Sequence, residues 1–323
     1  STLEKVYKEG SIISGSMNNT GIGNEYALDF LSFILNRLNK KDLSNLKILE
    51  IGCGNGYFLS LLKKLGASVV GVEPGPQGET GSKLYDVPII KDFFPTSKLS
   101  NKKFDIVIAY CVLEHVQAEN FLTELRNIVS GDLFIAVENE ESYINTGDIS
   151  ILFHEHISYF TKETLSRMLS LFDFKSLLIE ESIFSKILYS HSIPYDLVKI
   201  SNDDVHKFIK QAYNFKERSK VAENRIRSEI DDSKSFGIYV PGRFINVLSF
   251  LNFERVRFFD DNPILKGKYL PGFDIPIEDF NSFKENPVDK LYIASSSFER
   301  RIFEKVRKII SEHNIILWSN IYA

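Results

Sequence analysis

Glycines and carboxylates between Lys47 and Gly75 form the pattern with the most chemical content in this sequence. Residues 47–56 read KILEIGCGNG, an apolar run that leads into three glycines, and a second apolar run ends at Glu73. Glycine lets a backbone approach a ligand closely, and an acid after the neighbouring strand accepts hydrogen bonds from ribose hydroxyls. This order of strand, glycine-rich turn, helix and acid-tipped strand predicts a site for a cofactor that contains adenosine.

The spacing of the glycines distinguishes two classes of cofactor. Dinucleotide-binding turns follow G-x-G-x-x-G, whereas here Gly56 comes one residue early and Tyr57 occupies the expected position. The form E-x-G-x-G-x-G, from Glu50 to Gly56, resembles motif I of the class I S-adenosylmethionine (SAM) methyltransferases. The resemblance implies SAM as cofactor, with Glu50 and the glycines at its methionine end, Glu73 on its ribose and Asp92 on its adenine. The predicted contacts are Glu50, Gly52, Cys53, Gly54, Asn55, Gly56, Glu73, Pro74, Asp92 and Cys111.

Apolar runs and helical patterns alternate along the first part of the chain. We expect strands at residues 48–52, 68–73, 88–90, 104–112, 132–138, 176–182 and 185–192. Helical spacing occurs at residues 25–38, 57–65, 121–129 and 161–172. The run at 104–112 is apolar throughout, as expected for a strand buried on both faces of a parallel sheet. Alternating strands and helices at this spacing predict a doubly wound α/β sheet.

A second, smaller α/β unit is predicted at the end of the chain. Residues 201–233 have the pattern of a long amphipathic helix, and SFGIYVPGRF then begins a new series of strand-like runs. We therefore expect a cofactor-binding domain at 1–200, a connecting helix at 201–234 and a small domain at 235–323. Asp260 and Asp261 are assigned to a turn before Asn262, because no glycine-rich loop accompanies them.

Composition and charge exclude several classes of protein. The chain has 323 residues, 43% of them hydrophobic and 25% charged, with a formal net charge of −4. This balance is typical of soluble globular proteins and gives no basic surface for nucleic acid. No apolar run is long enough for a membrane span, and the first residues lack the apolar core of a signal peptide, so we expect a cytoplasmic protein. Two cysteines, Cys53 and Cys111, do not support a disulfide framework.

Histidines next to the predicted sheet are the candidates for proton transfer. His115 follows the strand at 104–112, and His154 and His156 flank Glu155 on a loop of some fifteen residues after the strand at 132–138. Ligands of open α/β sheets lie at the carboxyl ends of the strands, so these residues are expected at the mouth of the pocket. Imidazole can take a proton near neutral pH. The remaining histidines, His191, His206 and His313, are assigned structural roles.

A narrower resemblance rests on HEHISYF, at residues 154–160, together with DDNP and KGKYLPG in the second unit. These segments resemble the sugar C-methyltransferases that act on nucleotide-linked 4-keto-6-deoxysugars, over roughly residues 45 to 323. The resemblance implies that His156 removes a proton next to the keto group, that Glu155 assists and that His115 lies near the carbonyl. His154 completes the predicted catalytic set. The chain departs from that family in lacking a Cys-rich zinc module and in having Phe153 where a tyrosine is usual.

Other functions remain open at this point. An O-methyltransferase acting on a sugar or another small hydroxylated metabolite would need only one base, again His156 or His115. An NAD-dependent sugar oxidoreductase would use Glu73 but conflicts with Tyr57, and a SAM-binding regulator would leave the HEH segment unexplained. If residues 154–156 were a strand, both histidines would share a face and could bind a metal with His115. We expect no metal, because methylation of carbon does not require one.

Overall fold

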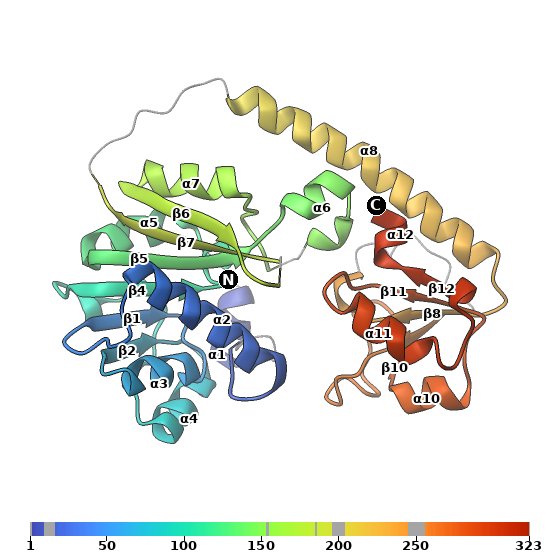
Figure 1. Cartoon of the computed structure of the whole chain (residues 1–323), viewed down its shortest axis with the longest axis horizontal. Helices are drawn as coiled ribbons and strands as arrows, with labels where there is room; N and C mark the ends of the chain where they lie inside the picture. Colours follow the sequence, from blue (N-terminus) through green and yellow to red (C-terminus); the bar gives the residue numbers. More distant parts are fainter. Residues whose placement is uncertain are drawn as a thin grey trace. The chain divides into compact units, whose positions relative to one another are not determined.

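A computed structural model describes residues 2–9, 17–152, 155–184, 186–195, 204–244 and 256–322. The chain divides into two compact units (Figure 1), one comprising Ser1–Asn139 and His154–Ile200 and the other Glu140–Phe153 and Ser201–Ala323. Each unit has its own sheet and its own hydrophobic core. None of the helices in the described ranges combines the length and the hydrophobicity needed to cross a lipid bilayer.

The sheet of the first unit has seven strands in the order β3-β2-β1-β4-β5-β7-β6. The strands are β1 (Lys47–Ile51), β2 (Ser68–Val72), β3 (Ile89–Ile90), β4 (Phe104–Tyr110), β5 (Val129–Glu138), β6 (Phe174–Glu181) and β7 (Ile187–Pro194). Strands β1 to β5 pair in parallel, and β7 pairs antiparallel with both β5 and β6. The doubly wound α/β fold predicted from the sequence is confirmed.

Helices cover both faces of this sheet. The described helices of the unit are α1 (Thr2–Glu9), α2 (Gly21–Leu38), α3 (Tyr57–Lys64), α4 (Pro76–Tyr85), α5 (Ala118–Ile128) and α7 (Lys162–Leu171). Residues of α2 and α3, such as Phe30 and Phe58, are buried in the cluster on one face, while α5 and α7 contribute Phe121 and Leu165 to the cluster on the other. Burial on both faces explains why β4 is apolar along its length.

Helix α4 was not predicted from the sequence, because it contains the helix-weakening residues Gly78 and Gly81. Both glycines are buried, and a Cβ on Gly81 would lie 1.8 Å from the carbonyl oxygen of Asn55. The backbone of the predicted cofactor turn therefore packs directly on α4. Glycine is required at this position by close approach rather than by helix propensity.

The second unit has a parallel sheet of five strands in the order β10-β9-β8-β11-β12. The strands are β8 (Phe236–Tyr239), β9 (Val256–Phe259), β10 (Ile277–Glu278), β11 (Lys290–Ile293) and β12 (Ile315–Leu317), and the helices are α6 (Glu141–Thr146), α8 (Asp204–Asp231), α10 (Phe280–Glu285), α11 (Glu299–Val306) and α12 (Trp318–Tyr322). Residues of α8 and α12 are buried on one face of the sheet, and residues of α10 and α11 on the other. The predicted second α/β unit is confirmed.

The division of the chain differs from the predicted boundaries at 200 and 234 in two ways. The long helix α8 belongs to the second unit instead of standing between domains, because Ala222 and Ile226 are buried in the core of that unit. Residues 140–153 also belong to the second unit, although they lie between β5 and Glu155 in sequence. The predicted loop after β5 is in fact partly helical, with α6 followed by a 3-10 turn at Ile149–Ile151.

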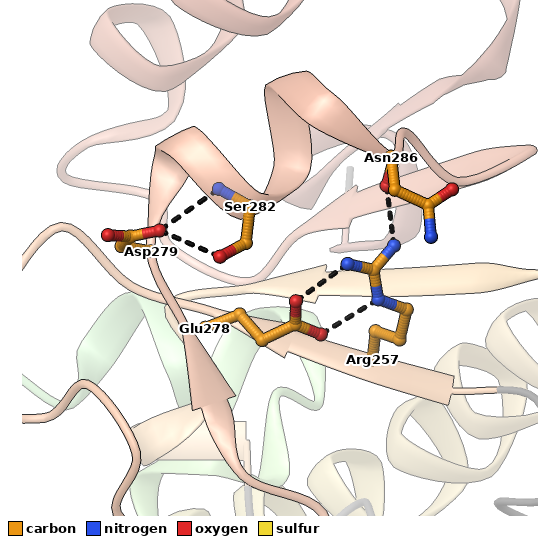
Figure 2. A network of polar contacts seen from close by, with 5 residues as sticks. All are labelled: Arg257, Glu278, Asp279, Ser282 and Asn286. Carbon is orange, nitrogen blue, oxygen red and sulfur yellow. Dashed lines mark hydrogen bonds and ion pairs between the residues drawn. The ribbon is translucent and has the colours of Figure 1, made fainter.

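Polar contacts join β9, β10 and α10 in the second unit (Figure 2). Arg257 donates from Nε and Nη2 to the two carboxylate oxygens of Glu278, at 2.8 and 2.6 Å, and from Nη1 to the carbonyl oxygen of Asn286. Asp279 caps α10 by accepting from the backbone N–H and the hydroxyl of Ser282. The bidentate pair of Arg257 and Glu278 ties an edge strand, β10, to its neighbour β9 in the sheet.

Replacing Arg257 with methionine should destabilise the second unit by about 1–3 kcal/mol, since the two hydrogen bonds to Glu278 and the one to Asn286 are lost and Glu278 stays three-quarters covered. Thermal denaturation of the full chain would measure the change. Arg307→Met is the matched control: Arg307 pairs with Glu304 and Glu312 on an exposed surface, so its loss should have a much smaller effect on stability. Equal effects of the two substitutions would contradict the structural role of the Arg257 pair.

Candidate functional site

The glycine-rich turn lies at the carboxyl edge of the first sheet, between β1 and α3. Gly52, Gly54 and Gly56 all have positive φ, at 69°, 53° and 74°. The backbone N–H groups of Gly52 and Cys53 donate to the carbonyl oxygen of Val72, so the turn is attached to the end of β2. These backbone angles are ones that only glycine adopts readily, which explains the three glycines of the motif.

Glu73 connects the loops that follow β1 and β2. Its carboxylate accepts from the backbone N–H of Gly54 at 2.9 Å, from that of Gly75 at 2.8 Å and from the side-chain amide of Gln77 at 2.9 Å. Burial raises the pKa of Glu73, and the hydrogen bonds from Gly75 and Gly54 counteract part of that rise. The carboxylate lies at the carboxyl end of β2, where the sequence pattern expects ribose hydroxyls to bind.

Glu50 provides a test of whether a cationic cofactor fits this edge. Its side chain is 1% exposed, and its Oε2 atom is buried without a hydrogen-bond partner. Burial and the nearby charge of Glu73 raise the pKa of Glu50 well above its ordinary value. In the described part of the chain, no lysine or arginine forms an ion pair with either carboxylate. A ligand that brings positive charge, as SAM does through its ammonium and sulfonium groups, would offset this unfavourable burial.

The other predicted cofactor residues occupy different positions at this edge. Asp92 follows β3 and accepts from Thr96 at 2.8 Å and from Lys98 at 3.3 Å, and the Thr96 bond in particular lowers its pKa. Asn55 accepts from the backbone of Tyr57 at the start of α3. The contact of Asp92 with adenine stays a prediction, as does that of Pro74, which directly follows Glu73.

The two cysteines are both free thiols. Cys53 is buried, with Sγ only 2.4 Å from where a Cβ on Gly71 would lie, so its side chain is directed into the sheet. Burial raises the pKa of this thiol well above its ordinary value. Cys111 follows β4 with a φ of 52°, and its N–H donates to the carbonyl oxygen of Ala136. Any contact of Cys53 with a cofactor would therefore come from its backbone.

His115 and His156 lie together at the carboxyl ends of β4 and β5. Their ring centroids are 4.8 Å apart at an interplanar angle of 72°. His156 Nε2 lies 3.8 Å from Oε2 of Glu138, the last residue of β5. His115 Nδ1 lies 3.2 Å from the backbone carbonyl oxygen of Glu155. Because a carbonyl oxygen can only accept, Nδ1 of His115 carries the proton, and Nε2 of a neutral His115 is left as an acceptor.

The backbone of Glu114 supports the segment that carries His156. Its carbonyl oxygen accepts from the N–H groups of Ile157 at 2.8 Å and Ser158 at 3.3 Å. Burial, followed by the proximity of His156, lowers the pKa of His115. The two histidines therefore differ electrostatically: His115 is held neutral, whereas the carboxylate of Glu138 lies beside His156 and would stabilise its protonated form.

Tyr7 belongs to this cluster, although nothing in the sequence pattern pointed to it. Its hydroxyl donates to Oε2 of Glu155 at 3.4 Å, and its ring lies edge-on to that of His115, with centroids 6.2 Å apart. Burial and the charge of Glu155 raise the pKa of Tyr7 well above its ordinary value, so its hydroxyl remains a donor near neutral pH. A short helix far ahead of the glycine-rich turn carries no local motif that could have identified it.

A divalent cation is geometrically compatible with part of the cluster. Glu114, His115 and His156 each offer a ligand atom, and these atoms lie within 4.8 Å of one another. One carboxylate and two imidazoles form a donor set that transition metals accept. From the sequence we expect no metal, because methylation of carbon does not require one, and the metal site considered there used His154, His156 and His115. Glu114, which lies with His115 and His156, was not among those ligands.

Some predicted residues are not brought into the site. Phe153 and His154 lie outside the described residues, as does the side chain of His206. His191 is a core residue, stacked on Phe134 and 2.6 Å from Asp132, which agrees with its assigned structural role. His313 is exposed on the second unit. Asp260 accepts from the backbone of Asn262, as expected for the assigned turn, and Asp261 bonds to Tyr239.

Comparisons with known proteins bear on the first unit. Residues 24–179 match a family model described as a methyltransferase domain. This range includes the glycine-rich turn, Glu73 and the His115–His156 cluster. The strands of the second unit lie outside the match.

Curated relatives carry the name ubiquinone biosynthesis O-methyltransferase. The protein from Pelagibacter ubique (strain HTCC1062) is 31% identical over 121 residues, covering 33% of this chain and 49% of the relative. The mitochondrial protein from Rattus norvegicus is 33% identical over 133 residues, covering 36% of this chain and 37% of the relative. The chain thus spans less than half the length of these two relatives.

Two of the solved structures that this chain matches are methyltransferases by title. One is the magnesium protoporphyrin IX methyltransferase from Synechocystis PCC 6803 with bound S-adenosylhomocysteine (SAH). It is 14% identical with a TM-score of 0.44, and the match covers 55% of this chain and 90% of that one. The putative methyltransferase of Haloferax volcanii, in complex with the Trm112 activator, is 12% identical with a TM-score of 0.46, covering 55% of this chain and 93% of that one.

Replacing Glu73 with alanine should weaken SAM binding about tenfold or more, because charge-assisted hydrogen bonds to the ribose are worth about 1.5–3 kcal/mol each. Calorimetric titration with SAM would measure the affinity. Glu73→Gln serves as the matched variant, since it keeps an acceptor oxygen and should lose less. Unchanged SAM affinity in Glu73→Ala, or tight binding of NAD by the wild type, would contradict the assignment.

Proposed function

Because residues 24–179 form a SAM-dependent methyltransferase domain, we propose that this protein methylates an oxygen atom of a small hydroxylated metabolite, with His156 as the general base. The curated relatives support oxygen as the acceptor atom, since both are named O-methyltransferases. Those matches cover about a third of the chain, so they bear on the chemistry of the first unit. SAM supplies an activated methyl group, which leaves the protein to position the acceptor and remove its proton.

The observation that carries the choice of base is the Glu138 carboxylate beside His156. When a hydroxyl attacks the methyl carbon, its proton passes to an imidazole nitrogen and a positive charge forms on the ring. A carboxylate 3.8 Å from Nε2 stabilises that charge. His115 is less suited to accept a proton, because burial lowers its pKa. The carbonyl of Glu155 orients the ring of His115, whose Nε2 can instead accept a hydrogen bond from the hydroxyl group of the substrate.

Methylation of carbon is the second candidate, and the Tyr7–Glu155 pair is the observation that favours it. Enolate formation next to a keto group requires a base for the C–H proton and a donor for the developing oxyanion. Tyr7 remains protonated near neutral pH and lies beside His115 and Glu155, so it could supply the donor. The predicted nucleotide-linked keto-deoxysugar would then be the acceptor. The names of the curated relatives support this alternative less than O-methylation.

Trideuteromethyl-labelled SAM would identify the acceptor atom. We expect label to be transferred to hydroxylated acceptors, tested with a panel of sugars and other small hydroxylated metabolites, and the product to show a methoxy carbon by NMR. The same assay with nucleotide-linked 4-keto-6-deoxysugars tests the alternative. Transfer of label to carbon, or exchange of the acidic C–H with deuterium in the absence of SAM, would contradict O-methylation and support the sugar C-methyltransferase hypothesis.

His156→Asn should lower the rate of methyl transfer by roughly 10²–10⁴-fold, because the variant cannot accept the acceptor's proton. The affinity for SAM should stay close to that of the wild type. His313→Asn is the control, since His313 is an exposed histidine on the second unit. If His156→Asn kept its activity while His115→Asn lost it, the general base would be His115.

A further inference from the structure

The segment between β5 and Glu155 is part of the core of the second unit. The first unit holds the chain as far as Asn139, whose N–H donates to the carbonyl oxygen of Lys186, and again from Ile157, whose N–H donates to Glu114. Residues 140–153 between these points belong to the second unit. The chain therefore leaves the first unit after Asn139, contributes residues 140–153 to the second unit and then returns to the first unit, which contains Glu155 and His156.

Asp148 is the buried residue that attaches residues 140–153 to the rest of the second unit. It is 0% exposed and caps the 3-10 turn at Ile149–Ile151 by accepting from the N–H of Ser150. Its other carboxylate oxygen accepts from Nε1 of Trp318 at 2.6 Å. The hydroxyl of Tyr322 faces the same carboxylate: burial, and then the charge of Asp148, raise the pKa of Tyr322. Asp148 thus joins α6 and the turn to α12, about 170 residues further along the chain.

Packing around Asp148 holds the segment from two more sides. Gly147 has a φ of 78°, and a Cβ at this position would lie 2.3 Å from the backbone nitrogen of Ser219 in α8. Ile149 packs against the hydrophobic cluster between α8 and the second sheet. Arg225 of α8 in turn donates to the carbonyl oxygen of Ile321 in α12. Residues 147–149 are therefore held by α8, by α12 and by the core of the unit.

The donors to Asp148 are an indole and a backbone amide, and the phenol of Tyr322 beside them is neutral as well. A buried carboxylate that depends on neutral donors is sensitive to the loss of any one of them, because the remaining charge stays desolvated. His156 follows Asp148 by eight positions in the chain, a span of at most about 29 Å when fully extended.

We propose that Asp148, Trp318 and Tyr322 are positioning residues for the reaction: they fix the incoming end of the Glu155–His156 segment, so that the carboxyl-terminal unit is required for an ordered catalytic base. The consequence for turnover rests on the role of His156 in the proposed function. The positioning itself does not, because it concerns the order of the segment whichever acceptor is used.

The test compares full-length Trp318→Phe with the wild type by two measurements that need no acceptor. Trp318→Phe keeps an aromatic ring but removes the N–H donor together with one ring of the indole, whereas Tyr322→Phe removes a hydroxyl alone. We expect the backbone amides of Ile157 and Ser158 to exchange hydrogen about tenfold faster, and acylation of His156 by diethyl pyrocarbonate, mapped by mass spectrometry, to accelerate. The affinity for SAM should stay unchanged. Tyr322→Phe, a smaller change at the same carboxylate, should have the same effects to a lesser degree.

Tyr239→Phe is the matched control, because it removes a hydroxyl that donates to another carboxylate of the same unit, Asp261, at 2.7 Å. It should leave exchange at Ile157 and acylation of His156 at wild-type rates. Wild-type rates in folded Trp318→Phe and Tyr322→Phe would overturn the proposal. So would an equal acceleration in Tyr239→Phe, which would indicate general loosening of the second unit. Neither result would bear on whether oxygen or carbon is methylated.

Discussion

Burial of carboxylates at the carboxyl edge of the first sheet is the constraint on which the cofactor site depends. Glu50 and Glu73 are both almost fully covered, and burial raises the pKa of each. Glu73 is stabilised by backbone N–H groups from the loops after β1 and β2, so the glycine-rich turn and the acid determine each other's position. Glu50 has an oxygen without a partner. This is an unfavourable charge distribution, and a cationic cofactor at the predicted site would relieve it on binding.

The strand order brings the buried carboxylates and the two histidines to the same edge of the sheet. Because β1 lies between β2 and β4, and β4 lies between β1 and β5, the cofactor loops and the loops carrying His115 and Glu138 emerge at one edge of the sheet. Glu50 lies on β1, and only β4 stands between β1 and β5, the strand that ends at Glu138. Along this edge the buried carboxylates are followed by His115, whose pKa is lowered by burial, and by His156, which lies 3.8 Å from the carboxylate of Glu138.

Local patterns in the sequence were sufficient for the strands, the glycine-rich turn and the histidines. Each of these features is encoded within a few residues: continuous apolar runs for buried strands, and glycines where φ is positive. Tyr7 and the assignment of residues 140–153 could not be predicted in this way. Tyr7 acts through a contact with a residue 148 positions away, and Asp148 through a contact with one 170 positions away. An aspartate before a turn looks like an ordinary cap until its distant partner is known.

Domain boundaries drawn from the sequence differ from those of the structure because contacts between distant residues decide which unit a segment joins. A boundary at residue 200 assumes that units are consecutive in sequence, whereas the second unit here includes residues 140–153 from within the first. The chain passes from one unit to the other three times, and two of these passages flank the segment between β5 and His156. No local pattern in the sequence shows that residues 140–153 fold with strands that come much later in the chain, because the contacts that hold them there, such as that of Asp148 with Trp318, join residues far apart in sequence.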